Sequence, residues 1–532
     1  MDCTTTFLPY EGTGYFSKIT ADYLKQADTL RPFYQYTPDL EGIRQSLEAR
    51  KKTATDRNLL VSALHEQYSG LEISPKVKAN IELLAAPNTF TITTAHQPNI
   101  FTGPLYFIYK IMHAVKLAEE LAESFTGARF VPVYYMGSED ADLDELGFVN
   151  VGGQKLVWDT KQTGAVGRMK VDKAFLKIIQ NIEGQVAVLP KGAALVELFR
   201  LCYTEGKLIQ QATLELVNRL FADYGVVVVI PDHAGLKSAF TGTVTRELTR
   251  QFSHEAVVQT VQALSQHYKV QAAGRTINLF YLINDKRERI EPEGDHFTVQ
   301  ALQLRFTQEE ILQELQQHPE RFSPNVILRG VFQETILPNV AFIGGGGELA
   351  YWLELKKVFE AAGVPYPVLL LRNSFLFVEK EQQQRLEKLA MRQQDLFTDT
   401  TAYINALVKS STANQLELTN ELQEATVFYQ KLESLAGAID NSLTDHVAAL
   451  KVKALKKLEE LEKKMLRAEK DKFETTIRQI TAIKAALFPG NNLQERTDNF
   501  ALFYSKYGTE WMDVIYRSSK GLQQEFGVIY AS

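Results

Sequence analysis

The sequence predicts an α/β protein with a doubly wound core, followed by a long α-helical coiled-coil domain. From about residue 86 to 375, apolar β-branched runs alternate with helical patterns, which is typical of a parallel sheet covered by helices. The run GVVVVIPD at Gly225–Asp232 is apolar on both faces, as strands between two helical layers are. Residues 376–487 contain no proline and are rich in Leu, Lys, Glu and Gln, which favours long helices.

Composition limits the class of protein. A chain of 532 residues exceeds one ordinary core, so we expect two to four structural units. The 45% hydrophobic and 23% charged residues are typical of a soluble globular protein. The net charge of −6 gives no reason to expect nucleic acid or a membrane as a partner. Cys3 and Cys202 form no metal or redox motif, and the N-terminus lacks a signal-peptide pattern, so we expect a cytoplasmic protein.

Six strands and four helices are expected in the core. The strands are predicted at Thr89–Ala95, Phe130–Met136, Gly225–Asp232, Ile277–Asn284, Val340–Gly344 and Pro367–Arg372. The helices are predicted at Pro104–Ser124, Ala194–Tyr224, Leu236–His267 and Glu348–Ala362. The predicted domains are an N-terminal helical segment packing on the core (1–85), the core (86–375) with insertions at about 150–193 and 268–325, the helical domain (376–487) and a closing segment that returns to the core (488–532).

A heptad-like apolar seam marks the helical domain. Its steps of three and four residues predict a coiled coil with one stutter. The apolar positions are Leu443, Val447, Leu450, Ala454, Leu458, Leu461, Met465 and Ala468. A helix near Val378–Lys409 is one candidate for an antiparallel partner within the chain, and a second subunit is the other candidate.

The first candidate site is the polar turn between the strand at Thr89–Ala95 and the helix that follows it. Pro104 suits the first turn of that helix, and the residues before it can cap the helix. A strand that ends in polar groups beside a free helix N-terminus predicts a site for an anion or a nucleotide phosphate. The candidate residues in the turn are His96, Gln97, Thr102 and Gly103.

The second candidate site follows the strand at Phe130–Met136. Five of the seven residues from Glu139 to Glu145 are acidic, and Glu139, Asp140 and Asp142 are candidate catalytic residues. Carboxylates at the carboxyl end of such a strand can hold Mg²⁺, accept an ammonium group or act as a base. The alternative is a loop that only begins the next helix, because Asp and Glu favour first turns.

The third candidate site surrounds four consecutive glycines, Gly344–Gly347, between a strand and a helix. Glycines let backbone N–H groups approach a phosphate or a carboxylate, although the spacing matches neither a P-loop nor a dinucleotide fingerprint. A nearby arginine could clamp a carboxylate through two hydrogen bonds. The candidate substrate-binding residues are Asn325, Arg329, Gln333, Gly345, Gly346, Glu348, Tyr351 and Trp352.

Two further sets carry weaker signals. Asp232 and His233 follow a strong strand and could face the crevice, but we expect them to form a surface pair. Near the C-terminus, PGNNLQERTDNF offers polar residues that either cap the coiled coil or contact a nucleotide. These candidates are Gln494, Arg496 and Asn499.

Seven motifs in a fixed order make the chain similar to one known family. They are FTGPLYFIYK (Phe101–Lys110), SEDADLDEL (Ser138–Leu146), TGAVGR (Thr163–Arg168), NLFYL (Asn278–Leu282), SPNVILR (Ser323–Arg329), GGGGELAYWLELK (Gly344–Lys356) and PGNNLQER (Pro489–Arg496). Through these motifs the chain resembles, nearly end to end, the bacillithiol biosynthesis cysteine-adding enzymes.

The resemblance implies a cytoplasmic ligase that attaches L-cysteine to the glucosamine amine of glucosaminyl-malate, the last step of bacillithiol biosynthesis. It also implies a Rossmann-like core similar to class I aminoacyl-tRNA synthetases, ATP-driven activation of cysteine, and a homodimer formed through the coiled coil. Mg²⁺ could accompany the nucleotide, and ADP could bind at the base of the coiled coil. The crevice would then hold His96, Gln97, Thr102, Glu139, Asp140, Asp142, Asn325, Arg329 and Glu348, with nucleotide contacts at Gln494, Arg496 and Asn499.

The chain departs from the family pattern at two places. It reads AHQPN at Ala95–Asn99 where members commonly read GQQPG or GHQ, and EDAD where they commonly read EDHD, with Ala141 replacing histidine. His96 is therefore the expected general base, because an unperturbed imidazole titrates near neutrality. Two alternatives stay open: a catalytically silent nucleotide-binding coiled-coil scaffold, and a different amino-sugar amide ligase.

Overall fold

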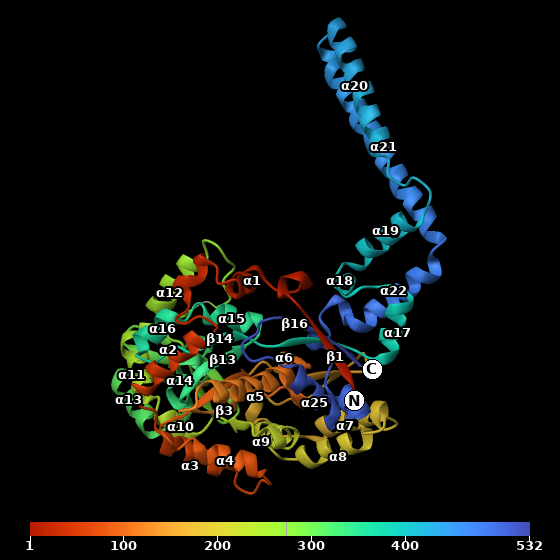
Figure 1. The fold of residues 1–532 in the computed structure, drawn as a ribbon. Helices are drawn as coiled ribbons and strands as arrows, with labels where there is room; N and C mark the ends of the chain where they lie inside the picture. The colour runs from red at the N-terminus through yellow and green to blue at the C-terminus, as the bar shows by residue number, and fades with distance from the viewer. Residues whose placement is uncertain (273, 532) are drawn as a thin grey trace. The chain divides into compact units, whose positions relative to one another are not determined.

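A five-stranded parallel sheet forms the centre of the larger of two structural units (Figure 1). The computed structural model describes residues 1–272 and 274–531; the larger unit comprises Met1–Phe377 and Asn492–Ser532, and the smaller comprises Val378–Asn491. The strands lie in the order β14 (Val368–Leu371), β13 (Asn339–Gly344), β2 (Thr89–His96), β3 (Arg129–Met136) and β6 (Val227–Val229), and all neighbours are parallel.

The strand order reverses between β2 and β13. The chain runs outward from β2 through β3 to β6, returns to β13 on the other side of β2, and continues to β14. In an open α/β sheet, ligands bind outside the carboxyl ends of the strands at such a reversal. The predicted doubly wound core is therefore confirmed, and its switch point lies where β2 ends at His96 and β13 ends at Gly344.

Two helices cover one face of this sheet with apolar side chains. Helix α2 (Leu40–Lys51) contributes Ile43 and Leu47, and α5 (Tyr106–Ser124) contributes its inner face, to a buried cluster around Phe90 and Ile92 of β2. Every residue of β13 and β14 is buried. Strands enclosed in this way carry continuous apolar runs, which is why the sequence pattern located them.

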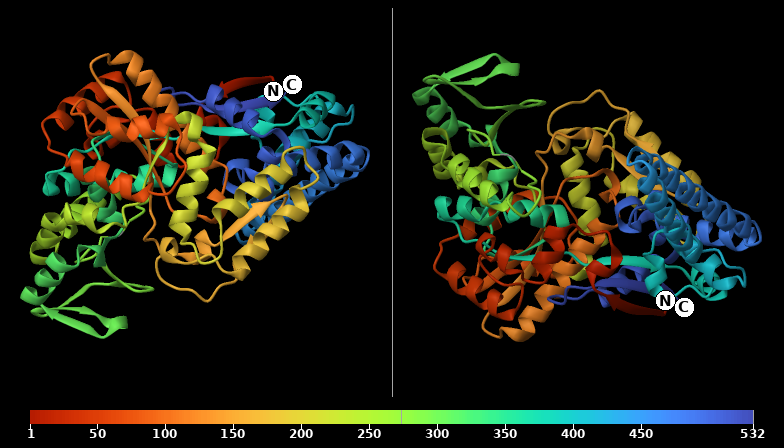
Figure 2. Two further views of the ribbon diagram at one scale, coloured as in Figure 1. Left: turned by 90° about the horizontal axis from the view of Figure 1, so that it is seen from below. Right: turned by 90° about the horizontal axis from the view of Figure 1, so that it is seen from above.

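Five of the six predicted strands lie in the parallel sheet, and the sixth does not. Strand β7 (Leu279–Ile283), predicted at Ile277–Asn284, pairs antiparallel with β8 (Lys286–Arg289) and β12 (Phe322–Pro324). It belongs to a segment that also holds a second antiparallel sheet, β9 (Glu291–Glu293), β10 (His296–Val299) and β11 (Leu304–Thr307), and helix α13 (Gln308–Gln317). Figure 2 shows these green strands projecting from one end of the larger unit.

The segment after β3 contains the other addition to the core. It consists of the hairpin β4 (Phe148–Val151) and β5 (Gln154–Val157), followed by helices α7 (Lys173–Val186), α8 (Gly192–Cys202) and α9 (Ile209–Leu220). A single helix predicted at Ala194–Tyr224 is therefore wrong, because residues between α8 and α9 form a turn.

Two other predicted helices are also broken. The helix expected at Leu236–His267 is three helices, α10 (Ala234–Ser238), α11 (Thr241–Arg250) and α12 (Phe252–Leu264), with Gln251 in the left-handed conformation between the last two at φ 47°. The helix expected at Glu348–Ala362 is two, α15 (Gly346–Trp352) and α16 (Lys356–Ala362). Apolar periodicity continues across these breaks, so it could not reveal them.

Strands from near the two ends of the chain meet in a further three-stranded sheet. Strand β1 (Cys3–Leu8) pairs antiparallel with β16 (Phe526–Ala531), which also pairs with β15 (Ser374–Val378). The N-terminal segment is thus not only helical, as expected, because a strand precedes α1 (Lys18–Leu24), α2, α3 (Arg57–Gln67) and α4 (Pro75–Leu83). The closing segment contains α23 (Gln494–Thr497), α24 (Ala501–Tyr507) and α25 (Thr509–Ser518) before β16.

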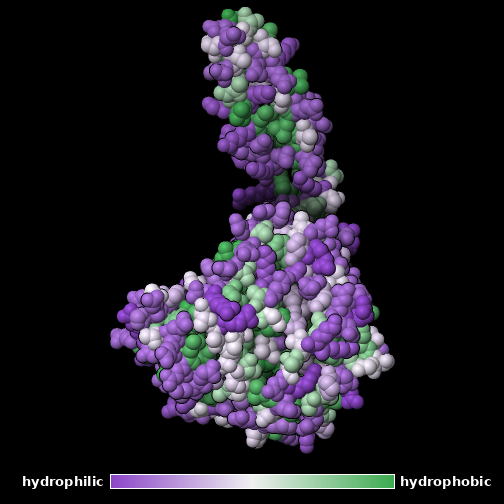
Figure 3. All heavy atoms as spheres, turned by 90° about the vertical axis from the view of Figure 1, so that its left-hand side faces the viewer, coloured by the Kyte–Doolittle hydropathy of each residue, from purple (hydrophilic) through white to green (hydrophobic). Residues whose placement is uncertain are grey.

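The smaller unit is built around a helical hairpin. Helix α20 (Thr419–Ile439) packs along α21 (Ser442–Asp471), and α19 (Thr400–Ser411) and α22 (Glu474–Leu487) contact α21 and each other. The intrachain partner of the predicted seam is therefore α20 rather than a helix near Val378–Lys409. The hairpin covers the seam incompletely, because Leu443, Leu450 and Leu461 are 40–47% exposed. Apolar side chains appear on its surface among charged ones in Figure 3.

Within the described parts of the chain, every helix is too short or too polar to cross a membrane.

A buried ion pair joins α2 to helix α14 (Val326–Ile336) of the core. Arg50 Nη2 donates to Glu334 Oε2 at 2.6 Å, and both side chains are almost fully buried. Gln333 and Asn339 donate two more hydrogen bonds to the same carboxylate. Burying two charges is costly, so the pair is stable only while both partners are present.

Replacing Glu334 with Ala should lower the free energy of unfolding by about 3–5 kcal/mol, because Arg50 would stay buried without its partner. Urea denaturation followed by tryptophan fluorescence would measure it, since all three tryptophans lie in the larger unit. Glu48→Ala is the control, because Glu48 pairs with Lys51 on the exposed side of α2 and should change stability little. Equal effects of the two substitutions would contradict this account.

Candidate functional site

Two neighbouring cavities open at the carboxyl ends of β2, β3 and β13. The glycine-loop cavity, of about 360 Å³, is lined by His96, Gln97, Tyr106, Lys110, Glu145, Gln271, Arg329, Gly345, Gly346, Gly347, Glu348, Tyr351, Arg372 and Arg496. The acidic-loop cavity, of about 430 Å³, is lined by Gln97, Tyr135, Gly137, Ser138, Glu139, Asp140, Pro231, Arg275, Phe280, Arg287, Pro324, Asn325, Val326, Arg329 and Tyr351. Gln97, Arg329 and Tyr351 line both, so the two cavities form one crevice at the switch point.

His96 ends β2 and faces the glycine-loop cavity. Its ring packs edge-on against Tyr106, and its Nε2 is buried without a hydrogen-bond partner in the described residues. Burial, followed by the charges of Lys110, Arg329 and Arg372, lowers the pKa of His96 well below its usual 6.5. The expectation that His96 titrates near neutrality is therefore wrong, and the imidazole is neutral at pH 7.

Lys110 brings a positive charge beneath the glycine loop. It lies on the second turn of α5, is 2% exposed, forms an ion pair with Glu348, and donates to the carbonyl of Ala95 at 2.8 Å. Glu348 also accepts a hydrogen bond from the Gly345 amide at 2.8 Å. Sequence reasoning missed Lys110, because a single lysine inside an apolar helix pattern reads as a surface residue; its place in the motif FTGPLYFIYK is the signal that could have found it.

Arg329 and its neighbours connect the two cavities. Arg329 projects from α14, and its Nη2 donates to the hydroxyl of Tyr351 at 3.2 Å. It forms no ion pair among the described residues, so its charge is available to a ligand in either cavity. Across the crevice, Gln97 Nε2 donates to Asp140 Oδ2 at 3.1 Å, which fixes that carboxylate at the rim.

Glu139 is buried in an ion-pair network rather than free in the acidic-loop cavity. It pairs with Lys237 and accepts a hydrogen bond from Ser323 Oγ at 3.1 Å. Lys237 also lies 3.7 Å from Asp232, which Arg168 binds through two hydrogen bonds of 2.7 Å. Burial alone would raise the pKa of Asp232, but Arg168 and Lys237 hold it below its ordinary value.

Asp232 therefore does not belong to a surface pair. Its side chain is 4% exposed and is held from two sides by cations, whereas His233 caps α10 through its Nδ1. The prediction failed because the partners lie 64 residues away at Arg168 and five residues away at Lys237, and neither spacing is a recognisable pattern.

The closing segment meets the glycine-loop cavity beside two arginines, Arg372 of the core and Arg496 of the closing segment itself. Arg372 is 3% exposed, pairs with Glu495 at 2.7 Å and lies over the ring of Tyr106. The adjacent Arg496 lines the cavity and has no ion-pair partner in the described chain. Burial, followed by the neighbouring charge of Arg372, lowers the pKa of Arg496 from its ordinary value.

The structure brings together most of the predicted residues but not all. Those that line the crevice are His96, Gln97, Glu139, Asp140, Asn325, Arg329, Gly345, Gly346, Glu348, Tyr351 and Arg496. Those that do not line it are Asp142, Thr102, Gly103, Gln333, Trp352, Gln494 and Asn499.

The residues outside the crevice have structural contacts. Asp142 caps the short helix α6 (Leu143–Leu146), as the alternative interpretation of the acidic loop held. Trp352 stacks on Phe342 with ring centroids 4.3 Å apart, and Gln333 bonds to the buried Glu334. Gln494 pairs with both backbone groups of Phe377.

The N-terminus of α5 is not a free anion site. The helix begins at Tyr106, two residues later than predicted, and the Leu105 amide donates to the carbonyl of Asp498 at 2.8 Å. The Gly103 amide donates to Ile100, while Asn499 donates to the carbonyls of Phe101 and Gly103. The turn is thus closed by the C-terminal segment, which lies about 400 residues away in the sequence.

The crevice has an excess of unpaired positive charge. Among the described residues, four arginines lining it lack an ion-pair partner, namely Arg275, Arg287, Arg329 and Arg496. Arg287 stacks on the ring of Phe280 at 3.9 Å, and burial lowers its pKa from the ordinary value. Guanidinium groups without partners bind carboxylates and phosphates. The described residues contain no group of three or more His, Cys, Asp or Glu side chains arranged to hold a metal ion.

The fold and crevice place the chain among Rossmann-like proteins with a ligand site at the switch point. Residues 1–373 match the family model described as "Bacillithiol biosynthesis BshC, N-terminal Rossmann-like domain", and residues 375–531 match its "C-terminal coiled-coil domain". The chain therefore belongs to the BshC family of bacillithiol biosynthesis.

Full-length relatives agree with this assignment. The chain is 39% identical to a protein of Flavobacterium johnsoniae and 38% identical to one of Christiangramia forsetii, each over 99% of both chains; both are named "Putative cysteine ligase BshC". A solved structure described as a putative arginyl-tRNA synthetase from Campylobacter jejuni aligns with 80% of this chain and all of its own, at 9% identity. Its TM-score of 0.22 is too low to support any conclusion.

The depressed pKa of His96 leads to a direct test. The imidazole should stay neutral from pH 8 to pH 6, because burial and three cations oppose protonation. NMR of ¹³C-labelled histidine would follow it, with His96→Gln identifying its signal. Since the unfolded chain takes up this proton near pH 6.5 and the folded chain does not, His96 should also reduce stability as the pH falls below that value. A titration midpoint near 6.5 would contradict the burial argument.

Proposed function

We propose that the protein joins L-cysteine to the glucosamine amine of glucosaminyl-malate and thereby performs the last step of bacillithiol biosynthesis. Family membership supports the pathway, and the names of the relatives support the transfer of cysteine. The observation that carries the proposal is Arg329, an unpaired cation at the junction of two cavities beside an acidic loop. Amide formation between a carboxylate and an amine needs such a junction, where two substrates meet.

The donor carboxylate is the group we assign to Arg329. Both oxygens of a carboxylate can accept hydrogen bonds from one guanidinium, and the Tyr351 hydroxyl orients that group. The ammonium group of cysteine then faces Asp140, whose carboxylate is held by Gln97 on the opposite side. A carboxylate and an ammonium group held on opposite sides would fix an amino acid in one orientation.

The acceptor amine must be neutral to attack. The C–N bond forms as the amine nitrogen attacks the activated carbonyl carbon, the activating group leaves with its bonding electrons, and one N–H proton passes to a base. We propose His96 as that base, because its Nε2 is buried without a hydrogen-bond partner among the described residues and the negative charge of bound substrates would offset the cations that lower its pKa. The surrounding cations favour rapid loss of the proton, so His96 returns to its neutral form.

ATP is the expected source of activation, and the glycine-loop cavity suits its anionic part. Arg496 supplies unpaired charge, and Gly345–Gly347 leave room for phosphate oxygens near the backbone. When bound, ATP would convert the cysteine carboxylate into a form with a good leaving group. Mg²⁺ would enter with the phosphates, since this ion needs few protein ligands when phosphates and water complete its shell. Because the proposed reaction consumes ATP, we place the protein in the cytoplasm, where ATP is available.

A homodimer through the helical hairpin is also part of the proposal. Apolar side chains on α20 and α21 are left uncovered in the single chain, including Phe428 at 57% and Ile439 at 83% exposure. Coiled-coil helices with such positions gain stability by covering them with further helices. A second copy of the same hairpin offers a matching surface.

Thiol analysis in cells that make bacillithiol tests the function. Deleting the gene should remove bacillithiol and accumulate glucosaminyl-malate, measured by mass spectrometry, and the intact gene should restore the thiol. An unchanged thiol pool in the deletion strain would contradict the ligase assignment, provided that no second gene encodes the same activity. The silent scaffold or another amino-sugar ligase would then explain the fold.

Replacing Arg329 with Ala should raise the KM for cysteine at least about tenfold, because one charge-assisted contact is lost. Initial rates with each substrate varied in turn would measure this change. Arg200→Ala is the matched control, since Arg200 pairs with Glu183 on the surface and should leave the kinetics unchanged. Unaltered KM values in the Arg329 variant would remove this arginine from the site.

A further inference from the structure

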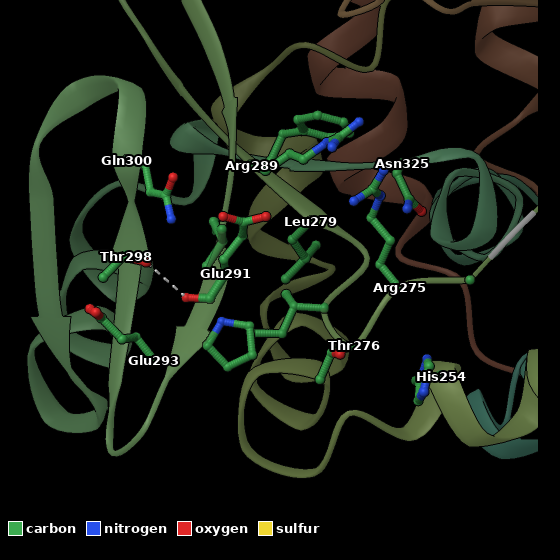
Figure 4. Close-up of a pocket in the computed structure, with 15 residues that line it drawn as sticks. His254, Arg275, Thr276, Leu279, Arg289, Glu291, Glu293, Thr298, Gln300 and Asn325 are labelled. Atoms are coloured by element: carbon green, nitrogen blue, oxygen red, sulfur yellow. Dashed lines mark hydrogen bonds between the residues drawn. The ribbon is translucent and has the colours of Figure 1, made fainter.

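A third cavity lies beside the crevice, within the inserted antiparallel strands (Figure 4). This insertion cavity has a volume of about 480 Å³, larger than either crevice cavity. Its lining includes His254, Arg275, Phe280, Arg289, Glu291 and Asn325. Its size is within the range of small-molecule sites in proteins.

The insertion cavity adjoins the crevice. Arg275, Phe280 and Asn325 line both the insertion cavity and the acidic-loop cavity. A buried asparagine, Asn278, holds this junction in place: it exchanges hydrogen bonds of 2.9 and 3.0 Å with the backbone of Arg275 and accepts one of 2.8 Å from Asn325. The junction is therefore built into the fold, and a ligand can extend across it.

Two arginines give the insertion cavity a positive charge that the carboxylates in its lining offset only in part. Arg275 and Arg289 have no ion-pair partner among the described residues, and Figure 4 shows both guanidinium groups toward the same end of the cavity, beside Asn325. Of the two glutamates in the lining, Glu293 lies 3.9 Å from Arg305 on the neighbouring strand. Only Glu291 remains to offset two guanidinium groups.

The strand β8 explains how the positive charge spans two cavities. Arg287 and Arg289 are two residues apart, so they project from the same face of the strand. Arg287 lines the acidic-loop cavity and Arg289 lines the insertion cavity. The strand thus carries a row of guanidinium groups from the crevice into the insertion.

The geometry points to the insertion cavity as the binding site for the dicarboxylate end of the acceptor amino sugar. This inference rests on the proposed function, which requires an acceptor with an amine at one end and malate at the other. The guanidinium groups of Arg275 and Arg289 can each bind a carboxylate through two hydrogen bonds. The sugar then lies across Phe280 and Asn325 at the junction, and its amine reaches the crevice.

Further groups in the cavity suit the polar parts of such a ligand. His254 Nδ1 is buried and has no hydrogen-bond partner in residues 1–272 and 274–531. An unpartnered buried nitrogen is unfavourable unless a ligand or water bonds to it. Phosphate groups share the chemistry of carboxylates here, so the test must separate a nucleotide from the acceptor.

The test compares acceptors with and without the dicarboxylate. Wild-type enzyme should prefer glucosaminyl-malate to methyl glucosaminide, and Arg289→Ala should raise the KM for glucosaminyl-malate about 10- to 100-fold while leaving the KM for methyl glucosaminide, cysteine and ATP unchanged. Arg275→Gln should act in the same direction. Arg305→Ala is the matched control on the same inserted sheets, because Arg305 pairs with Glu293 and does not line the cavity.

The outcomes separate this inference from the proposed function. Calorimetric titration of glucosaminyl-malate into the full chain, without cysteine or ATP, provides a readout independent of turnover. Tight binding that Arg289→Ala weakens supports the site even if no amide forms. Turnover with an unchanged KM in that variant overturns the site and leaves the ligase standing. An effect confined to the KM for ATP would assign the cavity to phosphate, and equal losses for both acceptors would show that Arg289 does not act on the dicarboxylate; both outcomes overturn the inference.

Discussion

The buried ion pair between Arg372 and Glu495 is the interaction on which the crevice depends. Neither group is more than 3% exposed, and an uncompensated charge at such depth would cost several kcal/mol. The Arg372 amide donates to the carbonyl of Gly344, and Glu495 also accepts a hydrogen bond from the Phe375 amide at 3.2 Å. The pair therefore ties the closing segment of the chain to the ends of β13 and β14, and so places Arg496 in the glycine-loop cavity.

The positive charge gathered by these contacts determines the chemistry of the site. Lys110 and Arg372 have carboxylate partners, but Arg329 and Arg496 do not, and His96 lies among them. An imidazole in that field stays neutral, and a bound anion lowers the energy of the whole group of cations. Binding of an anionic substrate is thus favoured by the same charges that keep His96 neutral, and the negative charge of that substrate would raise the pKa of His96 toward its ordinary value.

The sequence was informative where chemistry and local pattern coincide. The parallel strands could be predicted because their apolar runs are continuous, and Arg329, Glu348 and Asp140 because each follows or flanks a strand end. The wrong predictions concern side chains that are buried away from the crevice. In the sequence Trp352 and Gln494 resemble site residues, but in the structure Trp352 packs in the interior and Gln494 forms hydrogen bonds with the backbone.

The residues that sequence reasoning missed depend on distant partners. Lys237 meets Glu139 across 98 residues, and Arg372 meets Glu495 across 123. Such pairs produce no periodic pattern in the sequence, because the two side chains come close only when the sheet brings their segments together. Lys110, Arg168 and Asn278 each occur within one of the family motifs. The motifs indicated that these positions matter but did not indicate what each side chain does.

In the reaction we propose, separate arginines would hold the carboxylates of separate substrates. Both proposed substrates carry carboxylates, so a single arginine facing both cavities could hold either one, and the wrong arrangement would keep the amine away from the activated carbon. With Arg329 at the junction and Arg275 and Arg289 in the insertion cavity, a dicarboxylate would gain two contacts that an amino acid held at Arg329 and Asp140 would not make. That difference in the number of contacts would determine which substrate lies where, and the inserted strands supply it.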